Sequence, residues 1–159
     1  MRNFIKHTTC LLTVIALAAG CSKNNDEQVD TEYPVIDLSA SNAFPQQCGV
    51  VKRGESFTFR AKLSDNIQLG SVSVDIHNNF DHHSHSTEVE ECQMEAVKTP
   101  VNPYLLIRSF PIAGGSKEVE INQTIAVPAD VDPGDYHFLI RLTDKEGWQT
   151  LKGISIKIQ

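Results

Sequence analysis

The amino-acid sequence predicts an all-β protein, an antiparallel β-sandwich of about seven strands. Three observations support this prediction. Apolar and polar residues alternate with a period of two in most runs after Pro34, and Gly, Pro, Asn and Asp separate these runs. No stretch of helical period is long enough to compete with the alternation. Such a pattern is typical of two antiparallel sheets that each bury one face and expose the other.

The expected strands are short runs of alternating apolar side chains. They cover residues 36–40, 57–63, 72–76, 104–110, 118–127, 136–142 and 154–158. Turn sequences such as 52–54 (Lys-Arg-Gly) and 132–134 (Asp-Pro-Gly) stand between them, because Gly, Pro and Asp favour the backbone conformations of turns. Residues 34–159 therefore form the predicted β-sandwich domain.

The N-terminal residues precede this domain and have a different character. Arg2 and Lys6 are followed by an apolar run over residues 11–20, which ends in small residues and is too short to span a membrane. Residues 1–20 are thus typical of a secretory signal peptide. Residues 17–21 resemble a bacterial lipobox, which implies cleavage before Cys21 and its acylation, palmitate included. The alternative is a secreted protein with a free Cys21.

The segment after Cys21 is polar, acidic and without periodicity, so residues 21–33 are expected to be the acylated cysteine and a flexible linker. Removal of residues 1–20 takes away Arg2 and Lys6 and no acidic residue, so the formal net charge changes from −6 to −8. Such a surface repels nucleic acid and attracts cations. We expect a lipid-anchored protein of the cell envelope, attached to the outer membrane and facing the periplasm or the exterior.

Two cysteines remain after Cys21, namely Cys48 and Cys92. Disulfides persist in an oxidising envelope, so these two residues are candidates for a disulfide. In the alternative interpretation, Cys92 and Met94 are soft ligands for a metal ion.

Two segments resemble bacterial immunoglobulin-like and cadherin-like domains. Residues 64–74 resemble the link between their second and third strands, and residues 133–147 resemble their penultimate strand and its turn. With its histidine cluster, the chain resembles a family of single-domain Bacteroidota lipoproteins that is known only as a domain of unknown function. The resemblance implies an immunoglobulin-like sandwich in which strands 72–76 and 136–142 are antiparallel neighbours. It implies no activity.

Histidines are the most distinctive feature of the predicted domain. Four of its five histidines fall within residues 75–85, and the fifth is His137. Because side chains alternate along a strand, burial of Val72, Val74 and Ile76 places His77 on the outer face. The same argument places His137 there, so the two form an expected cross-strand pair about 5 Å apart between Cβ atoms.

We expect the loop after His77 to fold over this pair and complete a metal site. Imidazole nitrogens favour Zn²⁺ or Cu²⁺ over Ca²⁺ or Mg²⁺. His83 or His85 would join the pair, and His82 is the expected spare residue. Asp75 and Asp81 would ligate the ion or hold an imidazole N–H. The alternative is an exposed polar loop that happens to be rich in histidine.

A second candidate is acidic and lies at predicted strand ends. Asp65 and Asn66 precede one strand, Asp144 and Glu146 follow another, and Asp37 is near the start of the domain. Oxygen ligands suit Ca²⁺. Capping of turns by Asp and Asn side chains is the alternative explanation of this pattern.

The sequence favours a zinc- or copper-binding envelope lipoprotein, with a surface module that binds a protein or glycan as the alternative. We expect no enzyme, since no Ser-His-Asp, Cys-His or phosphate-loop pattern is present. Hydrolysis at an open zinc site is the enzymatic alternative. The expected partners are a metal ion, the membrane through the lipid on Cys21, and an envelope protein.

Overall fold

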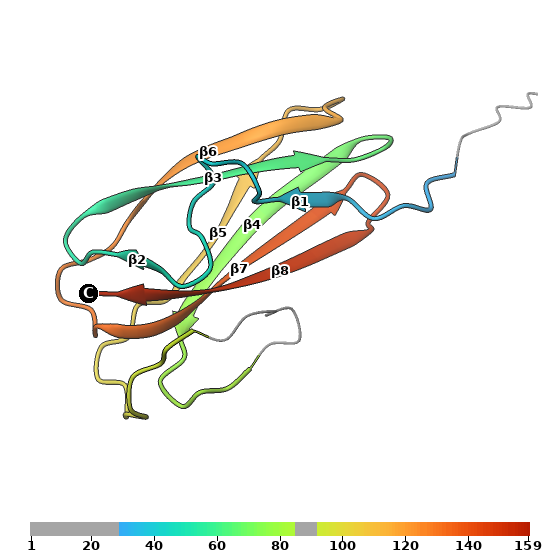
Figure 1. Cartoon of the computed structure of the whole chain (residues 1–159). Helices are drawn as coiled ribbons and strands as arrows, with labels where there is room; N and C mark the ends of the chain where they lie inside the picture. The colour runs from blue at the N-terminus through green and yellow to red at the C-terminus, as the bar shows by residue number, and fades with distance from the viewer. Residues whose placement is uncertain (1–28, 85–91) are drawn as a thin grey trace, which may run out of the picture.

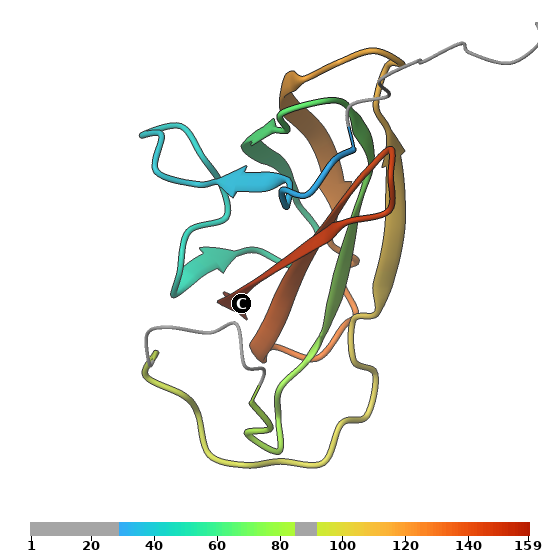
Figure 2. The ribbon, with the colours of Figure 1, turned by 90° about the vertical axis from the view of Figure 1, so that its right-hand side faces the viewer.

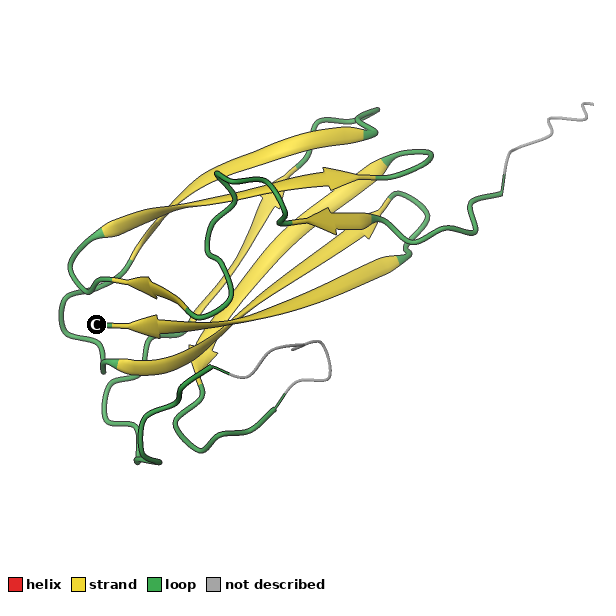
Figure 3. Cartoon of the chain, viewed as in Figure 1, coloured by secondary structure: helices red, strands yellow, loops and turns green. Residues whose placement is uncertain are grey.

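The computed structural model describes residues 29–84 and 92–159, and these residues form eight strands in two facing sheets (Figures 1 and 3). The prediction of an all-β, immunoglobulin-like sandwich is therefore confirmed. Residues 1–28, with the predicted signal peptide and Cys21, and residues 85–91, with His85, lie outside the described residues. The strands are β1 (Val35–Asp37), β2 (Gly49–Val51), β3 (Ser56–Ser64), β4 (Leu69–Asn78), β5 (Leu106–Pro111), β6 (Glu118–Ala126), β7 (Gly134–Asp144) and β8 (Gln149–Ile158).

One sheet has the strand order β1-β3-β6 and the other has the order β2-β8-β7-β4-β5. All pairs are antiparallel except the parallel pair β2–β8. The seven predicted strands correspond to β1 and β3 to β8. Strand β2 was not predicted, because its sequence Gly-Val-Val does not alternate apolar and polar residues. The part of the chain that the structure describes contains no helix that could cross a membrane.

The core lies between the two sheets and consists of the apolar members of the alternating runs. This core includes Phe59 and Leu63 of β3, Ile76 of β4, and Phe138 and Ile140 of β7, which are all buried. The Phe59 and Phe138 rings pack across it with their centroids 5.3 Å apart. Burial of such side chains contributes about 25 cal/mol per Å² of apolar surface removed from water, which is the main driving force for this fold.

Tyr136 at the start of β7 fastens the end of the sandwich. Its hydroxyl group donates a hydrogen bond to the Asp132 carbonyl oxygen, 2.7 Å away, and accepts one from the Tyr104 backbone N–H at 3.1 Å. This bond to the backbone just upstream is the tyrosine corner of immunoglobulin-like domains. Burial of the Tyr136 side chain raises the pKa of its hydroxyl group.

The last residues of the predicted linker, residues 21–33, dock on the domain. Asp30 is buried, and its backbone carbonyl oxygen accepts a hydrogen bond from the Trp148 Nε1–H at 3.1 Å. The Tyr33 ring also packs edge-on against the Trp148 ring, with centroids 4.9 Å apart. The linker prediction missed this docking because the segment has no periodicity to reveal it.

The long connection between β4 and β5 lies at the other end of the sandwich (Figure 2). A disulfide joins Cys92 in this connection to Cys48, which precedes β2, with the two Cα atoms 5.5 Å apart. This bond fastens the connection to the five-stranded sheet, and it commits the Cys92 sulfur, which is therefore no thiolate ligand for a metal ion.

Candidate metal centre

The cross-strand pair of histidines predicted from the sequence is present. His77 of β4 lies directly opposite His137 of β7 in the antiparallel register, and their ring centroids are 5.3 Å apart. The register follows from the apolar alternation, because burying Ile76 and Phe138 on one face puts both histidines on the other. Two rigid strands therefore hold this part of the site.

The loop after β4 adds a third imidazole. The His83 ring stacks on the His77 ring with centroids 5.6 Å apart and an interplanar angle of 11°. It also meets the His137 ring edge-on, with centroids 4.8 Å apart. One ring nitrogen from each of the three histidines lies within 4.8 Å of those of the other two. This convergence makes His77, His83 and His137 the candidate ligands.

A carboxylate holds each of the two more accessible imidazoles. Asp75 Oδ1 lies 2.9 Å from His77 Nδ1, and Asp81 Oδ1 lies 2.6 Å from His83 Nδ1. Because an ionised carboxylate only accepts hydrogen bonds, both Nδ1 atoms carry the proton. In a neutral ring the lone pair is then on Nε2. The bond from His83 lowers the pKa of Asp81 below its usual value. Asp75 and Asp81 thus orient imidazoles, a common arrangement around metal-binding histidines.

His137 has the opposite tautomer. Its Nε2 atom lies 3.1 Å from the His83 backbone carbonyl oxygen, which only accepts, so Nε2 carries the proton and a neutral ring has its lone pair on Nδ1. The same loop residue therefore orients His137 through its backbone and supplies an imidazole through its side chain.

His137 is completely buried, although the sequence analysis placed it on an outer, solvated face. It does lie on the outer face of the five-stranded sheet, but the connection between β4 and β5 covers this end of the sheet. Asp135, two residues earlier on the same face, is buried for the same reason. Alternation along β7 identified the face correctly and could not reveal the loop that covers it.

The other predicted ligands lie apart from the three histidines or outside the described residues. His82 lies outside the group of three, and its Nε2 donates to the Glu95 carbonyl oxygen, 2.8 Å away. The Met94 sulfur accepts a hydrogen bond from Asn79 Nδ2 at 3.7 Å. His85 is not described.

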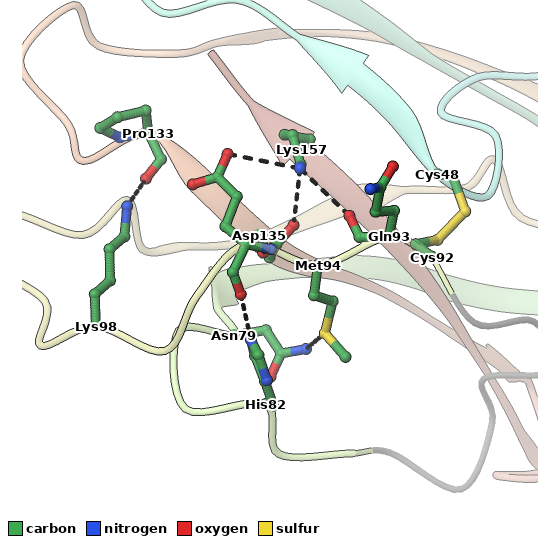
Figure 4. Close-up of polar contacts among 11 residues, drawn as sticks. Cys48, Asn79, His82, Cys92, Gln93, Met94, Lys98, Pro133, Asp135 and Lys157 are labelled. Carbon is green, nitrogen blue, oxygen red and sulfur yellow. Dashed lines mark hydrogen bonds and ion pairs between the residues drawn. A yellow bond between two sulfur atoms is a disulfide. The ribbon is translucent and has the colours of Figure 1, made fainter.

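Several residues that the sequence analysis missed hold the covering segment in place (Figure 4). Lys157 Nζ lies 3.6 Å from a carboxylate oxygen of Asp135 and 3.6 Å from one of Glu95. The Glu95 backbone N–H also donates to Asp135 Oδ2 at 2.7 Å, and Lys98 Nζ lies 4.4 Å from the Phe80 ring centroid. No pattern in the sequence pairs these residues, since each contact joins separate parts of the chain.

Chemically, three imidazoles with ring nitrogens within 4.8 Å of one another suit a borderline transition-metal ion. Zn–N bonds of about 2.0–2.1 Å place the nitrogens of a tetrahedral site about 3.3 Å apart. Binding would therefore draw the rings closer together. His83 is on a loop and has the most freedom to move, whereas His77 and His137 are fixed by the sheet.

Comparison with known proteins yields a family and distant structural neighbours. One neighbour is the GspB Siglec domain, with a TM-score of 0.42 and 20% identity, covering 82% of this chain and 59% of that one. Another is Spo0M, a sporulation control protein from Bacillus subtilis, with a TM-score of 0.39 and 11% identity, covering 82% of this chain and 50% of that one. The chain thus spans between half and three-fifths of these proteins.

No curated protein matches the sequence. The family model described as "Domain of unknown function (DUF4625)" matches residues 20–159, which include the whole sandwich and all three candidate ligands. The chain belongs to this family, DUF4625.

Proposed function

We propose that this protein binds one transition-metal ion, Zn²⁺ or Cu²⁺, through His77, His83 and His137. The observation that carries the proposal is the orientation of the three rings. Each donates one N–H to a carboxylate or a backbone carbonyl oxygen, and the three ring nitrogens of the group converge within 4.8 Å. An exposed polar loop that is rich in histidine by chance has no reason to adopt this arrangement.

The composition of the site selects the class of metal ion. The disulfide commits Cys92, so the soft-ligand alternative loses its thiolate and nitrogen ligands remain. His85, next to the described loop, is the proposed fourth ligand, and a water molecule is the alternative. We propose binding and not catalysis, because the two carboxylates beside the histidines, Asp75 and Asp81, already hold imidazoles.

The proposed setting is the outer membrane of the cell envelope, where a lipid on Cys21 would anchor the protein. A domain with excess negative charge attracts cations, which suits the acquisition, storage or delivery of a metal ion. This location rests on the lipobox resemblance.

The test is calorimetric titration of untagged protein with Zn²⁺ and with Cu²⁺ near pH 7. We expect one equivalent of at least one of the two ions to bind the wild type. The double variant His77→Ala/His137→Ala should lose this binding, while the matched control His82→Ala should retain it. Absence of heat with either ion, or wild-type affinity in the double variant, would contradict the proposal.

The pH dependence provides an independent check. Protons compete with the metal ion for imidazole, whose ordinary pKa is about 6.5. The affinity for the metal ion should therefore be highest above this range. It should fall by at least about tenfold when the pH is lowered from 7.5 to 5.5.

A surface-interaction module is the second candidate, and the outer face of the five-stranded sheet favours it. Edge strand β5 exposes 72% of Ile107, and Leu151 of β8 is 41% exposed on the same sheet. Of these two strands only β5 is an edge strand, and an exposed edge can pair with another chain. Capture of the same outer-membrane protein with and without chelator, and its loss in Ile107→Lys, would support this candidate over the metal site.

A further inference from the structure

Three aspartates gather at the end of the sandwich opposite the histidines. Asp65 begins the turn between β3 and β4, Asp144 ends β7, and Asp30 belongs to the docked N-terminal segment. One carboxylate oxygen from each lies within 4.8 Å of those of the other two. Asp65 and Asp144 belong to the acidic residues at the predicted strand ends, whereas Asp30 lies in the predicted linker, residues 21–33.

One oxygen of each carboxylate has a local structural role. Asp65 Oδ1 accepts two backbone N–H groups of its own turn at 2.8 and 2.6 Å, and Asp144 Oδ1 does the same at 2.6 and 2.8 Å. Asp30 Oδ1 accepts from the Glu32 N–H and from Asn66 Nδ2, each at 3.0 Å. Turn capping, the alternative explanation drawn from the sequence, therefore accounts for the Oδ1 atoms.

Turn capping does not account for the other carboxylate oxygens of the three aspartates. The Oδ2 atoms of all three aspartates and Oδ1 of Asn66 are buried without a hydrogen-bond partner among the described residues. Asp30 and Asp144 expose only 4% and 3% of their surface. A polar group buried in this way costs free energy unless a partner satisfies it, so four unsatisfied oxygens at one place indicate a missing ligand.

The charge of the three carboxylates favours a positively charged ligand. Within residues 29–84 and 92–159, none of the three aspartates forms an ion pair with a Lys or Arg side chain. The nearby Lys117 ammonium group instead donates to the Asn66 backbone carbonyl oxygen, 2.8 Å away. Buried carboxylates are normally paired with a cation or coordinate a metal ion, and here no side chain supplies the charge.

We propose that Asp30, Asp65, Asp144 and Asn66 form a Ca²⁺ site, separate from the histidine site. All four offer hard oxygen ligands, which Ca²⁺ prefers and which Zn²⁺ and Cu²⁺ favour less than imidazole. Ca²⁺–oxygen distances of about 2.3–2.6 Å give a coordination sphere about 5 Å across, and carboxylate oxygens within 4.8 Å of one another fit inside it. Mg²⁺ requires a tighter octahedron, so Ca²⁺ should bind better.

The site joins the N-terminal segment to the domain. Asp30 is the only one of the three aspartates that precedes β1, whereas Asp65 and Asp144 belong to the sandwich. Ca²⁺ would therefore hold the end of the segment that leads to Cys21 against the β3–β4 and β7–β8 turns. The cation would thus fix how the domain is oriented relative to that segment.

The test uses Tb³⁺, a luminescent substitute for Ca²⁺, with purified protein. Trp148 is the only tryptophan of the chain and contacts two of the ligands, since its backbone N–H donates to Asp144 and its Nε1–H to Asp30. Excitation of Trp148 should therefore produce sensitised Tb³⁺ emission with one equivalent bound. Ca²⁺ should displace Tb³⁺ at a lower concentration than Mg²⁺. Ca²⁺ at a hundredfold excess over its Kd should raise the Tm by on the order of 10 °C.

Conservative variants assign the signal to this site. Asp144→Asn keeps an oxygen to cap the turn and removes the charge, so it should lose emission and the Tm increase. Asp30→Asn should also lose emission and the Tm increase. Because Asp30 lies outside the strands, this variant serves as the test if Asp144→Asn fails to fold. The matched control is Asp37→Asn, because Asp37 also caps its own turn, by accepting from the Ser39 N–H at 2.8 Å, but lies outside the group.

Two further outcomes decide the proposal. The His77→Ala/His137→Ala variant should keep full Tb³⁺ emission, because the two replaced residues are at the other end of the sandwich. Absence of both emission and a Ca²⁺-dependent Tm change in the wild type, or equal responses in wild type and Asp30→Asn, would overturn the proposed Ca²⁺ site.

Discussion

A different group of candidate metal ligands lies at each end of the strand pair β4 and β7. His77 and His137 are at one end, and Asp65 and Asp144 are at or beside the other. His137 and Asp144 are seven residues apart in the same strand, which corresponds to about 24 Å. The candidate ligand atoms are thus nitrogens at one end of this strand pair and oxygens at the other, and under our proposals this difference should direct transition metals to the first group and Ca²⁺ to the second.

The two ends are also held together differently. At the histidine end a disulfide and an ion-pair network fasten the loop that supplies His83 and covers His137. At the aspartate end the N-terminal segment docks through hydrogen bonds, such as that from Trp148 Nε1–H to the Asp30 carbonyl oxygen. An aromatic contact between Tyr33 and Trp148 adds to them. We infer that the histidine site depends on covalent fastening of its loop, whereas a cation itself completes the aspartate site.

Removing the disulfide should have the largest effect on this comparison. Cys48→Ala/Cys92→Ala opens a link between residues 44 positions apart, so the free energy of unfolding should fall by roughly 2–4 kcal/mol. Urea denaturation measures this loss, and wild type under reducing conditions is the control. Zn²⁺ affinity should fall and Ca²⁺ affinity should remain. An equal loss of Zn²⁺ and Ca²⁺ affinity would contradict the inference that the disulfide stabilises only the histidine end.

Replacing Asp75 should have the next largest effect and should act at the histidine end alone. Asp75→Asn weakens the acceptor that holds His77, so Zn²⁺ or Cu²⁺ affinity should fall about 10- to 100-fold, measured by calorimetry. Asp81→Asn should have a smaller effect, because the Asp81 side chain is 72% exposed against 39% for Asp75 and water can replace it. A change in Tb³⁺ emission in either variant would break the proposed separation of the sites.

Tyr136→Phe should have the smallest effect and distinguishes global stability from the local sites. Loss of the hydroxyl group removes the partner of the Asp132 carbonyl oxygen and of the Tyr104 backbone N–H, which should cost about 1–2 kcal/mol in thermal or urea unfolding. Neither metal affinity should change, although Tyr136 is adjacent to His137. If Tyr136→Phe lost as much Zn²⁺ affinity as Asp75→Asn, the loss in Asp75→Asn could be explained by lower global stability and would not indicate a local role of Asp75.

The same variant should alter alkaline unfolding. Burial raises the pKa of Tyr136, so the folded state keeps its proton at a pH where the unfolded chain has lost it. The stability contributed is complete below the ordinary pKa of about 10 and is lost as the pH rises through the raised folded value. Tyr136→Phe should therefore flatten part of the alkaline loss of stability, and Tyr104, whose pKa burial also raises, should retain its share.

Local alternation predicted much of the histidine site. Burying Val74 and Ile76 fixes the face of His77, and burying Phe138 fixes that of His137. The resemblance to immunoglobulin-like domains supplied the neighbouring strands, and together these gave the observed pair. The complete burial of His137 was not predicted, because it depends on a loop whose position is set by Cys92, Glu95 and Lys157.

The aspartate group was much harder to predict. Asp65 and Asp144 are recognisable as turn residues, since each caps the turn that follows it. Asp30 comes from a polar, aperiodic segment, and its position depends on single long-range bonds from Asn66 and Trp148. Such contacts leave no periodic signal in the sequence. Strand β2 was missed for the related reason that Gly49, Val50 and Val51 show no alternation.

The most direct test of the central claim is X-ray absorption at the zinc edge, on protein loaded with one equivalent of Zn²⁺. We predict a first shell at about 2.0 Å containing three or four imidazoles and no sulfur. The imidazole signal should be lost in the His77→Ala/His137→Ala variant. A sulfur shell at about 2.3 Å, a shell of oxygen without imidazole, or an unchanged spectrum in that variant would contradict the assignment of His77, His83 and His137 as the metal ligands.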